Sequence, residues 1–284
     1  MIYVRRRLEL TAPNAAYLTP KSGVTYYSGG VALTGSDFVS SDDIPALISN
    51  NANITSATQT VYVDYNGRHY QFSVGDTFGI SVNGTMYAWR LMGFNHYDLT
   101  TATAYGAATA SGKAAMLFQM IDCFGTTQRM KQNASSTTGW HNSTLRTWMS
   151  GTLYGYLPTN TQNRIKTVNV RTATSVDSGD ITTTAETLFL PAEVEIFGTA
   201  TYAKGGTAEG TRYAWYTAHN TAADRIKNVG SSPNRWWTRS PYDWVDEYGT
   251  GVTYEAKFCT IFNDGTPSVR GAGYAAGVSA CFCI

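Results

Sequence analysis

Two Asn-Gly dipeptides, each set between runs of strand-forming residues, limit the possible folds of this chain more than any other pattern in it. The dipeptides and their flanks are Asn66-Gly67 between residues 60–65 and 69–74, and Asn83-Gly84 between residues 78–82 and 86–91. Asn-Gly favours the positive φ angles of a two-residue turn, so each pattern predicts a β-hairpin. Two successive hairpins require antiparallel sheet in this part of the chain.

Patterns that favour helix are few and short. They occur at residues 41–48, 113–124, 143–154, 161–168 and 191–197. Residues 113–124 are apolar and long enough for a buried helix, whereas Asn142 or Ser143 can cap the next segment and Gly198 can end the last. From Trp236 onward short strand-type segments alternate with loops. The sequence therefore predicts an α+β fold that is loop-rich, with short antiparallel strands and a few helices.

The composition changes near residue 60. Residues 1–60 are rich in Ser, Thr, Ala, Asn and Gly, with short apolar groups between turn residues. This favours a small β-rich N-terminal module for attachment or assembly, followed by one larger ligand-binding domain over residues 61–284. A chain of 284 residues has room for both.

Charge and hydropathy exclude several classes of function. Charged residues make up 14% of the chain, and 21 basic residues face 20 acidic ones. Nucleic-acid binding needs a basic excess, so it is not expected. No run approaches the ~20 apolar residues of a membrane span, and the arginines at 5–7 precede no apolar segment, so neither membrane insertion nor a signal peptide is expected.

The four cysteines do not form a disulfide framework. Cys281 and Cys283 are two residues apart and would point to the same face of a strand, which is a poor geometry for a mutual disulfide. We therefore expect free, buried cysteines in a chain made in a reducing cytosol.

The common catalytic patterns are absent. The sequence has no His-Glu-x-x-His, Gly-x-Ser-x-Gly, Walker A or Cys-x-x-Cys motif, and the glycines at 271, 273 and 277 lack dinucleotide-binding spacing. His96 and Asp98 lie close together in an Asn-His-Tyr-Asp segment, which fits either an acid/base or metal pair or, as we favour, a turn. We predict no catalytic residue, no metal ligand and no cofactor.

The C-terminal part contains an aromatic strand and two tyrosine-rich segments. Trp236, Trp237 and Arg239 fit a core strand that acts as scaffold, with sugar stacking as the alternative. Residues 242–250 and 270–276 combine large rings with Gly, Asp and Thr, the chemistry of antibody paratopes. The alternative is that these segments pack on the body of the protein.

From about residue 74 onward the chain resembles a domain family common in gut bacteria and their phages. The matching pieces, in order, are residues 74–78, 89–99, 139–146, 157–158, 165–168, 188–195, 225–227, 236–241 and 277–284. Members resemble the C-type-lectin-type fold, in the branch shared with formylglycine-generating enzymes and the variable proteins of diversity-generating retroelements. In such variable proteins the C-terminal strands display a ligand surface whose side chains change while the backbone is kept.

This resemblance implies a non-catalytic receptor-binding or adhesion protein of a phage tail, or a retroelement-diversified variable protein, located on the virion or the cell surface. The implied partners are a host cell-surface protein or glycan and other tail or fibre subunits, and analogy with fibre tips favours a homotrimer. The residues expected to face the ligand are Tyr242, Asp243, Trp244, Asp246, Tyr248, Thr250, Arg270, Tyr274 and Ser279.

Two other functions remain open at this stage: an enzyme of the formylglycine-generating type and a purely structural tail protein. Catalysis is not transferred, because Cys281 and Cys283 match the family's terminal motif rather than the active cysteine pair of those enzymes. The loops of calcium-dependent sugar binding are absent, and Ser232-Pro233-Asn234 lacks the carboxylate that calcium prefers. A structural calcium ion elsewhere is left open.

Overall fold

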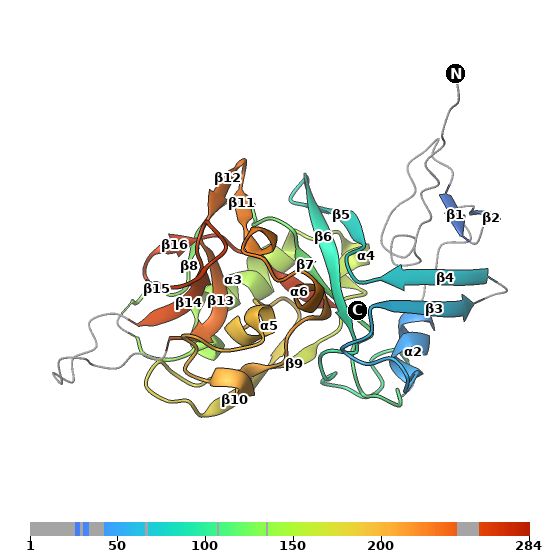
Figure 1. Cartoon of the computed structure of the whole chain (residues 1–284), viewed down its shortest axis with the longest axis horizontal. Coiled ribbons are helices and arrows are strands. Elements are labelled where there is room, and N and C mark those ends of the chain that lie inside the picture. Colours follow the sequence, from blue (N-terminus) through green and yellow to red (C-terminus); the bar gives the residue numbers. More distant parts are fainter. Residues whose placement is uncertain are drawn as a thin grey trace, which may run out of the picture.

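The computed structural model describes residues 26–28, 31–33, 43–65, 68–106, 108–134, 136–242 and 256–284, with backbone alone for 26–28, 31–33 and 68–69. The described part is a mixed α+β structure of mostly short antiparallel strands and few helices (Figure 1). Its helical segments are α2 (Asp43–Asn50), η2 (Trp140–Asn142), α3 (Thr144–Trp148), η3 (Met149–Leu153), α4 (Thr159–Gln162), α5 (Glu193–Phe197), η4 (Gly206–Glu209), α6 (Ala214–Ala218) and η5 (Ala223–Arg225).

The largest sheet has four antiparallel strands in the order β17-β7-β6-β5. These strands are β5 (Thr77–Val82), β6 (Thr85–Phe94), β7 (Met116–Met120) and β17 (Cys281–Cys283). Phe282 of the last strand pairs with Phe118 of β7, so the C-terminus closes the sheet beside a segment some 160 residues earlier. The register of β6 on β7 shifts between Leu91 and Gly93.

A second sheet of three strands lies in the C-terminal part, in the order β13-β14-β15. Its strands are β13 (Trp236–Pro241), β14 (Lys257–Ile261) and β15 (Pro267–Gly271). The remaining strands form pairs: β1 (Tyr26–Ser28) with β2 (Val31–Leu33), β3 (Thr60–Tyr65) with β4 (Arg68–Ser73), β9 (Val168–Ala173) with β10 (Ile181–Glu186), β11 (Lys227–Val229) with β12 (Ser232–Asn234), and β8 (Gln128–Arg129) with β16 (Ala275–Ala276).

Both predicted hairpins are confirmed. β3 pairs with β4, and β5 pairs with β6 from Thr77↔Arg90 to Val82↔Thr85. The second turn has φ of 49° at Asn83 and 78° at Gly84. A tight hairpin turn with two positive φ angles matches the right-handed twist of the strands, which is why Asn-Gly predicted it.

The helix predicted at residues 113–124 is wrong, because this segment contains strand β7. All five residues of β7 are buried, since the strand lies between β6 and β17 and is covered on both faces. A short apolar run without alternation fits a central strand as well as a buried helix, so periodicity could not separate the two.

The helix predicted at residues 161–168 is also wrong in its extent. The helix is α4, and the later half of the predicted segment joins the sheets instead, with Lys166 bridging to Cys283 and Val168 opening β9. The other helix signals are confirmed. Ser143 Oγ accepts from Arg146 N at 3.1 Å at the start of α3, and Gly198 ends α5 with φ of 78°.

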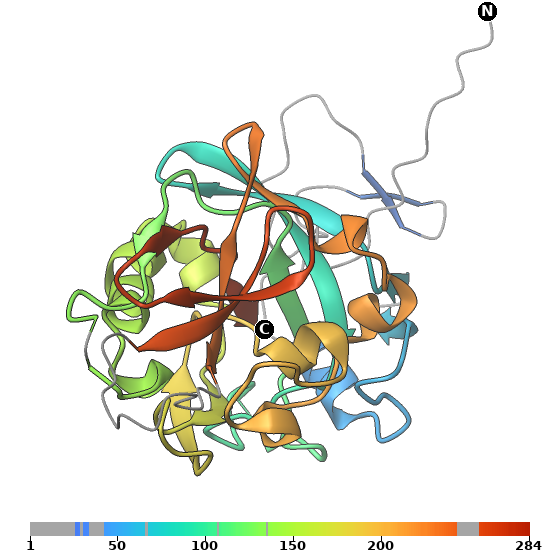
Figure 2. The same cartoon turned by 60° about the vertical axis from the view of Figure 1, so that its left-hand side comes forward.

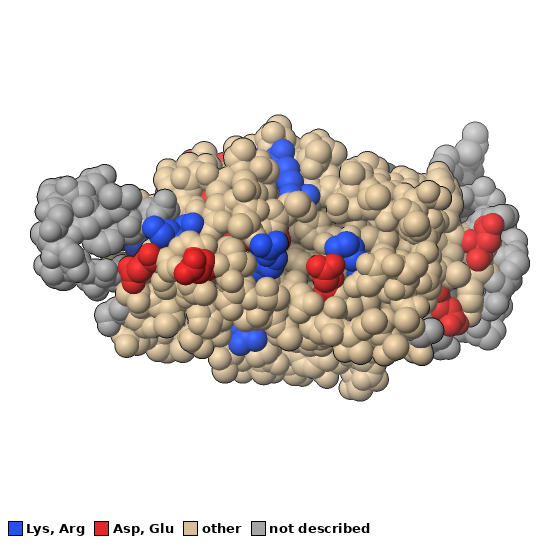
Figure 3. Space-filling model, turned by 90° about the horizontal axis from the view of Figure 1, so that it is seen from below, with Lys and Arg blue, Asp and Glu red and all other residues tan. Residues whose placement is uncertain are grey.

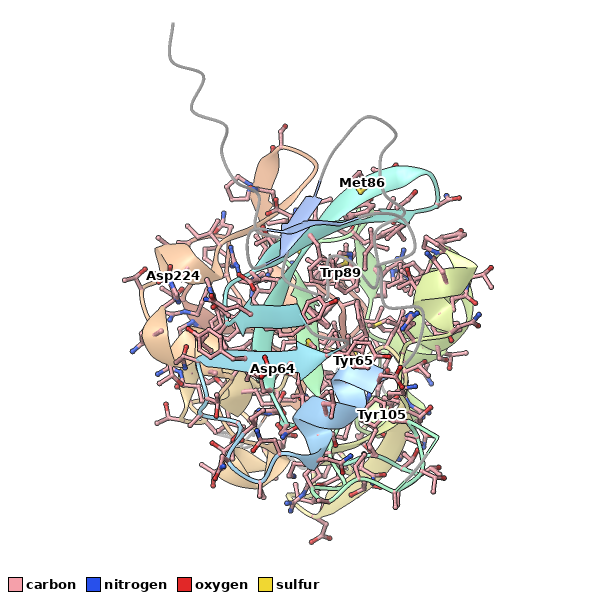
Figure 4. All side chains as sticks on the ribbon, turned by 90° about the vertical axis from the view of Figure 1, so that its right-hand side faces the viewer. Asp64, Tyr65, Met86, Trp89, Tyr105 and Asp224 are labelled. Atoms are coloured by element: carbon pink, nitrogen blue, oxygen red, sulfur yellow. The ribbon has the colours of Figure 1, made fainter. Side chains whose placement is uncertain are left out.

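The elements spread along one long axis (Figure 1). β3, β4 and α2 lie at one end, whereas β14, β15 and β16 lie at the other, and the rotated view agrees (Figure 2). At the first end α2 lies beside β3, where the Tyr65 hydroxyl donates to the Asp43 carboxylate (Figure 4). Ile44 and Ile48 of α2 belong to the same core cluster as both sheets, so the chain from Asp43 onward packs with the larger domain.

The surface is sparsely charged, as the composition predicts. On the face seen from below, charged side chains of both signs are few among uncharged ones, and several red and blue groups lie next to each other (Figure 3). In the described part of the chain, no helix combines the length and the apolar character that crossing a membrane requires.

Candidate functional site

The three-stranded sheet brings both tyrosine-rich segments to one of its ends. Tyr242 N donates to Lys257 O at 3.0 Å, and Lys257 pairs with Gly271 on its other side. Tyr242, the last described residue before position 243, therefore lies next to Lys257, beside the end of β15. We call Tyr242, Lys257, Arg270 and Tyr274 the sheet end. Asp243, Trp244, Asp246, Tyr248 and Thr250 lie outside the described residues.

Arg270 and Tyr274 form a stacked pair at this end. The guanidinium carbon of Arg270 lies 3.8 Å from the centroid of the Tyr274 ring, close enough for a cation–π contact. The turn between them is closed by Tyr274 N donating to Gly271 O at 3.1 Å. Arg270 is exposed, and Tyr274 exposes 50% of its surface, which is high for so large a ring.

Tyr202 belongs to the same region, although nothing in the sequence pattern singled it out. Its ring centroid lies 6.0 Å from that of Tyr242, and Ala203 bridges to Tyr242. The carboxylate of Glu193 accepts from the backbone N–H groups of Tyr202 and Ala203 at 2.9 and 2.7 Å. The only signal in the sequence was a lone tyrosine in a Thr-, Ala- and Gly-rich stretch.

Ser279 does not lie at the sheet end, and its expected contact with a ligand is corrected here. Its side chain is fully buried; Oγ donates to Met120 O at 2.9 Å and accepts from Gln119 Nε2 at 3.1 Å. Gln119 also accepts from the Tyr216 hydroxyl. Ser279 therefore satisfies polar groups in the interior beside β7, a role that its neighbours in the sequence do not indicate.

The three predicted scaffold residues are fully buried. The indole N–H groups of Trp236 and Trp237 donate to the carbonyl oxygens of Arg225 and Gln128, respectively. Since adjacent residues of a strand face opposite sides, the two rings anchor β13 on both of its faces.

Arg239 forms a buried ion pair with Glu195 of α5. Its Nη1 and Nη2 atoms lie 2.6 and 2.7 Å from the two carboxylate oxygens, and neither side chain is exposed. Burial alone would raise the pKa of Glu195, but the Arg239 guanidinium outweighs it and lowers that pKa. Tyr97 and Tyr213 also donate to this carboxylate, at 2.6 and 2.9 Å. The pair fixes α5 against β13 and thereby supports the strand that leads to the sheet end.

All four cysteines are free and buried, as predicted. Burial raises the pKa of the Cys281 and Cys283 thiols, and that of Cys123 to about 12. A thiol acts as a nucleophile in its thiolate form, so these positions disfavour cysteine chemistry.

Thiol labelling tests this arrangement. We expect iodoacetamide at neutral pH to modify none of the four cysteines in the folded chain and all four in denaturant, as measured by intact mass. The Cys281→Ser, Cys283→Ser double variant serves as control and should gain two labels in denaturant. Rapid labelling of Cys281 or Cys283 in the folded chain would contradict the burial and favour a reactive pair.

No group of three or more His, Cys, Asp or Glu side chains that could share a metal ion occurs among the residues described in Figure 1. Ser232, Pro233 and Asn234 form the short strand β12.

Comparison with protein families places residues 95–284 in the domain of unknown function DUF6273. The chain belongs to the DUF6273 family. No curated protein and no solved structure matches it. The DUF6273 region begins at Asn95, at the end of β6, and includes every residue of the sheet end.

Proposed function

We propose that this DUF6273 protein is a non-catalytic binding protein that contacts its partner with the sheet end and the segment 243–255. One observation carries the proposal: neighbouring strands of one sheet bring Tyr242 and the stacked Arg270–Tyr274 pair, about 30 residues apart in sequence, to the same end of that sheet. Exposed tyrosine and arginine dominate binding energy in many interfaces, because they offer large contact area and several hydrogen bonds at a small entropy cost.

The rigid support beneath the sheet end favours display rather than catalysis. β13 is anchored on both faces by Trp236 and Trp237 and by the buried Arg239–Glu195 pair. A surface whose framework is already rigid loses less conformational entropy when it binds, so less of the binding free energy is offset. The cysteines, which the enzymatic alternative needs, are buried thiols with raised pKa values.

We further propose, on the resemblance described above, that the domain has a C-type-lectin-like fold and acts in a phage tail or as a retroelement-diversified variable protein. Its partner would be a host cell-surface protein or glycan. The sheet end lies at one end of the long axis, and α2, β3 and β4 lie at the other (Figure 1). This placement suits attachment at one end and recognition at the other.

Binding to intact cells tests the proposed surface. We expect the Arg270→Ala, Tyr274→Ala double variant of the full chain to be retained on cells about tenfold less, or weaker still, because a stacked hot-spot pair is lost. Fluorescently labelled protein and a panel of gut bacteria provide the measurement. Tyr62→Ala is the matched control, since Tyr62 is an exposed tyrosine on β3 at the other end of the molecule.

Equal losses of binding from the double variant and the control would contradict a role for the sheet end.

The retroelement proposal has its own test, because sister copies of the gene should differ mainly at positions 242–255 and 270–274. Differences spread evenly along the chain would contradict it. A structural tail protein would instead bury Tyr274 against other subunits in the assembled particle.

A further inference from the structure

A polar cavity of about 360 Å³ lies where the end of β6, strand β9 and the segment 207–211 meet. It shares no lining residue with the sheet end, so it forms a separate site. Six of its lining residues carry polar side chains that can hydrogen-bond a ligand: Ser56, His96, Asn169, Arg171, Thr207 and Thr211. Of these, Asn169 also donates to Leu99 O at 3.4 Å. The size of the cavity falls at the small end of the range of ligand pockets, about 300–1,000 Å³, which limits the ligand to a small molecule.

The floor of the cavity is polar and rigid. Tyr97 and Glu195 line it, and they are joined by the 2.6 Å hydrogen bond and held by Arg239 behind them. Gly210 lies so close that a Cβ atom on it would stand 2.4 Å from Glu195 Oε1. The floor therefore keeps its shape whether or not a ligand is present, which reduces the entropy lost on binding.

The charges around the cavity are largely compensated in pairs. At the rim Lys113 Nζ lies 2.7 Å from Asp98 Oδ1, and in the floor Glu195 is paired with Arg239. Burial lowers the pKa of His96 to about 4, so its imidazole is neutral at neutral pH. The buried carboxylate of Glu209 also lines the cavity and accepts from Ala173 N at 2.9 Å and from the Thr172 hydroxyl at 3.1 Å, and Arg171 adds one exposed cation. A ligand with a strong charge would find no concentrated opposite charge, so the lining favours a neutral molecule.

The uncharged polar side chains of the lining can form hydrogen bonds with the hydroxyl groups of a ligand. Serine, threonine and asparagine side chains and a neutral imidazole can each donate and accept hydrogen bonds, as can the hydroxyls of a sugar. The partly buried His96 ring, held edge-on against Tyr97 and Tyr213 at 4.8 and 4.9 Å, is fixed in orientation. The Asn-His-Tyr-Asp segment is thus part of a cavity wall rather than a surface turn alone.

We propose that this cavity binds one neutral sugar unit, or an equally hydroxylated small molecule, through hydrogen bonds from Asn169, Arg171 and the hydroxyls of the 207–211 segment. This goes beyond the proposed partner binding, because it assigns a second, independent site to the same domain.

Imidazole NMR tests the site directly. The chain has four histidines, and a His96→Gln variant identifies the signal of His96. Glucose, N-acetylglucosamine, glucuronate and the amino acid serine are titrated separately into the full chain. We expect the neutral sugars to shift the His96 signal in a saturable way. Asn169→Ala and Arg171→Ala should each weaken that binding about tenfold, the effect of a lost charged or bidentate hydrogen bond.

Arg129→Ala is the matched control, because Arg129 is also an exposed arginine on a strand but lies outside the cavity. It should leave the titration unchanged. The proposal is overturned if no neutral sugar shifts the His96 signal up to its solubility, if glucuronate or serine alone does so, or if Arg129→Ala weakens the binding as much as Arg171→Ala.

Discussion

Replacing Arg239 with methionine is expected to lower the free energy of unfolding by about 3–5 kcal/mol, because the change leaves the buried Glu195 carboxylate without its counter-charge. Arg239 also donates to the carbonyl oxygens of Arg171, Leu190 and Glu209, and these would lose a donor in the interior. Urea unfolding followed by tryptophan fluorescence measures the loss. Arg239→Lys keeps the charge but not the bidentate contact. Its free energy of unfolding should therefore lie between those of the unmodified chain and of Arg239→Met.

Arg235→Met is the matched control, four residues earlier on the same stretch of chain. Arg235 is partly exposed and donates through Nη1 to Thr260, Ser268 and Val269 at 2.8–3.0 Å. Its replacement should cost about 1 kcal/mol, a typical value for accessible hydrogen bonds. An equal cost for both substitutions would show that the buried pair adds nothing. If Arg239→Met does not fold, Glu195→Gln still tests the pair, since it should be more damaging than Arg235→Met.

Alkaline pH is expected to destabilise the chain from pH 9 upward, most steeply near pH 10. Burial raises the pKa of all four thiols above the value near 9 that they have when unfolded. The folded state therefore retains four protons that the unfolded state releases, and this stability is lost as pH rises. Lys131 and Lys227 act in the opposite direction, because burial lowers the pKa of each to about 8 and the unfolded state keeps their protons.

At pH 9 the half-ionised thiols of the unfolded state nearly balance the two lysine protons, whereas at pH 10 the thiols are almost fully ionised and the net difference is about two protons. Burial also raises the pKa of Tyr97, Tyr213 and Tyr216, so these hydroxyls act in the same direction as the thiols near pH 10. The free energy of unfolding should then fall by at least about 2.7 kcal/mol per pH unit near pH 10, and much less steeply at pH 9. The slope is measured by urea unfolding in the presence of a reductant at about pH 8.0, 9.0, 9.5 and 10.0, values that bracket the thiol pKa of the unfolded state.

Two substitutions move this slope in opposite directions. Lys227→Met removes one proton that the unfolded state retains, so the free energy of unfolding should fall with pH more steeply, by about 1.4 kcal/mol per pH unit. Cys259→Ala removes one proton that the folded state retains and should make the fall less steep by the same amount. Because slopes are compared, a general loss of stability in either variant does not obscure the result. A free energy that stays level or rises from pH 9 to 10 in the unmodified chain would contradict buried, protonated thiols.

Local features of this chain were predicted well from its residues. The hairpin at Asn83-Gly84, the Ser143 cap and the Gly198 helix end are all present, because each depends on the backbone preference of one or two residues and on neighbours within four positions. The class, α+β with short antiparallel strands, followed from the same local signals.

Features that depend on burial were predicted poorly. Residues 116–120 were expected in a helix, because an apolar run shows no period that would identify the strand between β6 and β17. Ser279 was expected on the surface, and its partners Gln119 and Met120 lie about 160 residues away. Tyr202 gave no signal, since its contact with Tyr242 arises from the packing of two distant segments.

The amino-acid order alone settled the turns, the helix caps, the free cysteines and the low surface charge, since these depend on residue type and near neighbours. Tertiary structure decided that Glu195 meets Arg239, that Tyr242 and the Arg270–Tyr274 pair lie at the same end of one sheet, and that residues near 96, 170 and 208 enclose one cavity. The reason is physical: backbone preferences act over a few residues, whereas burial and ion pairing join groups whose separation in sequence carries no information about their distance in space.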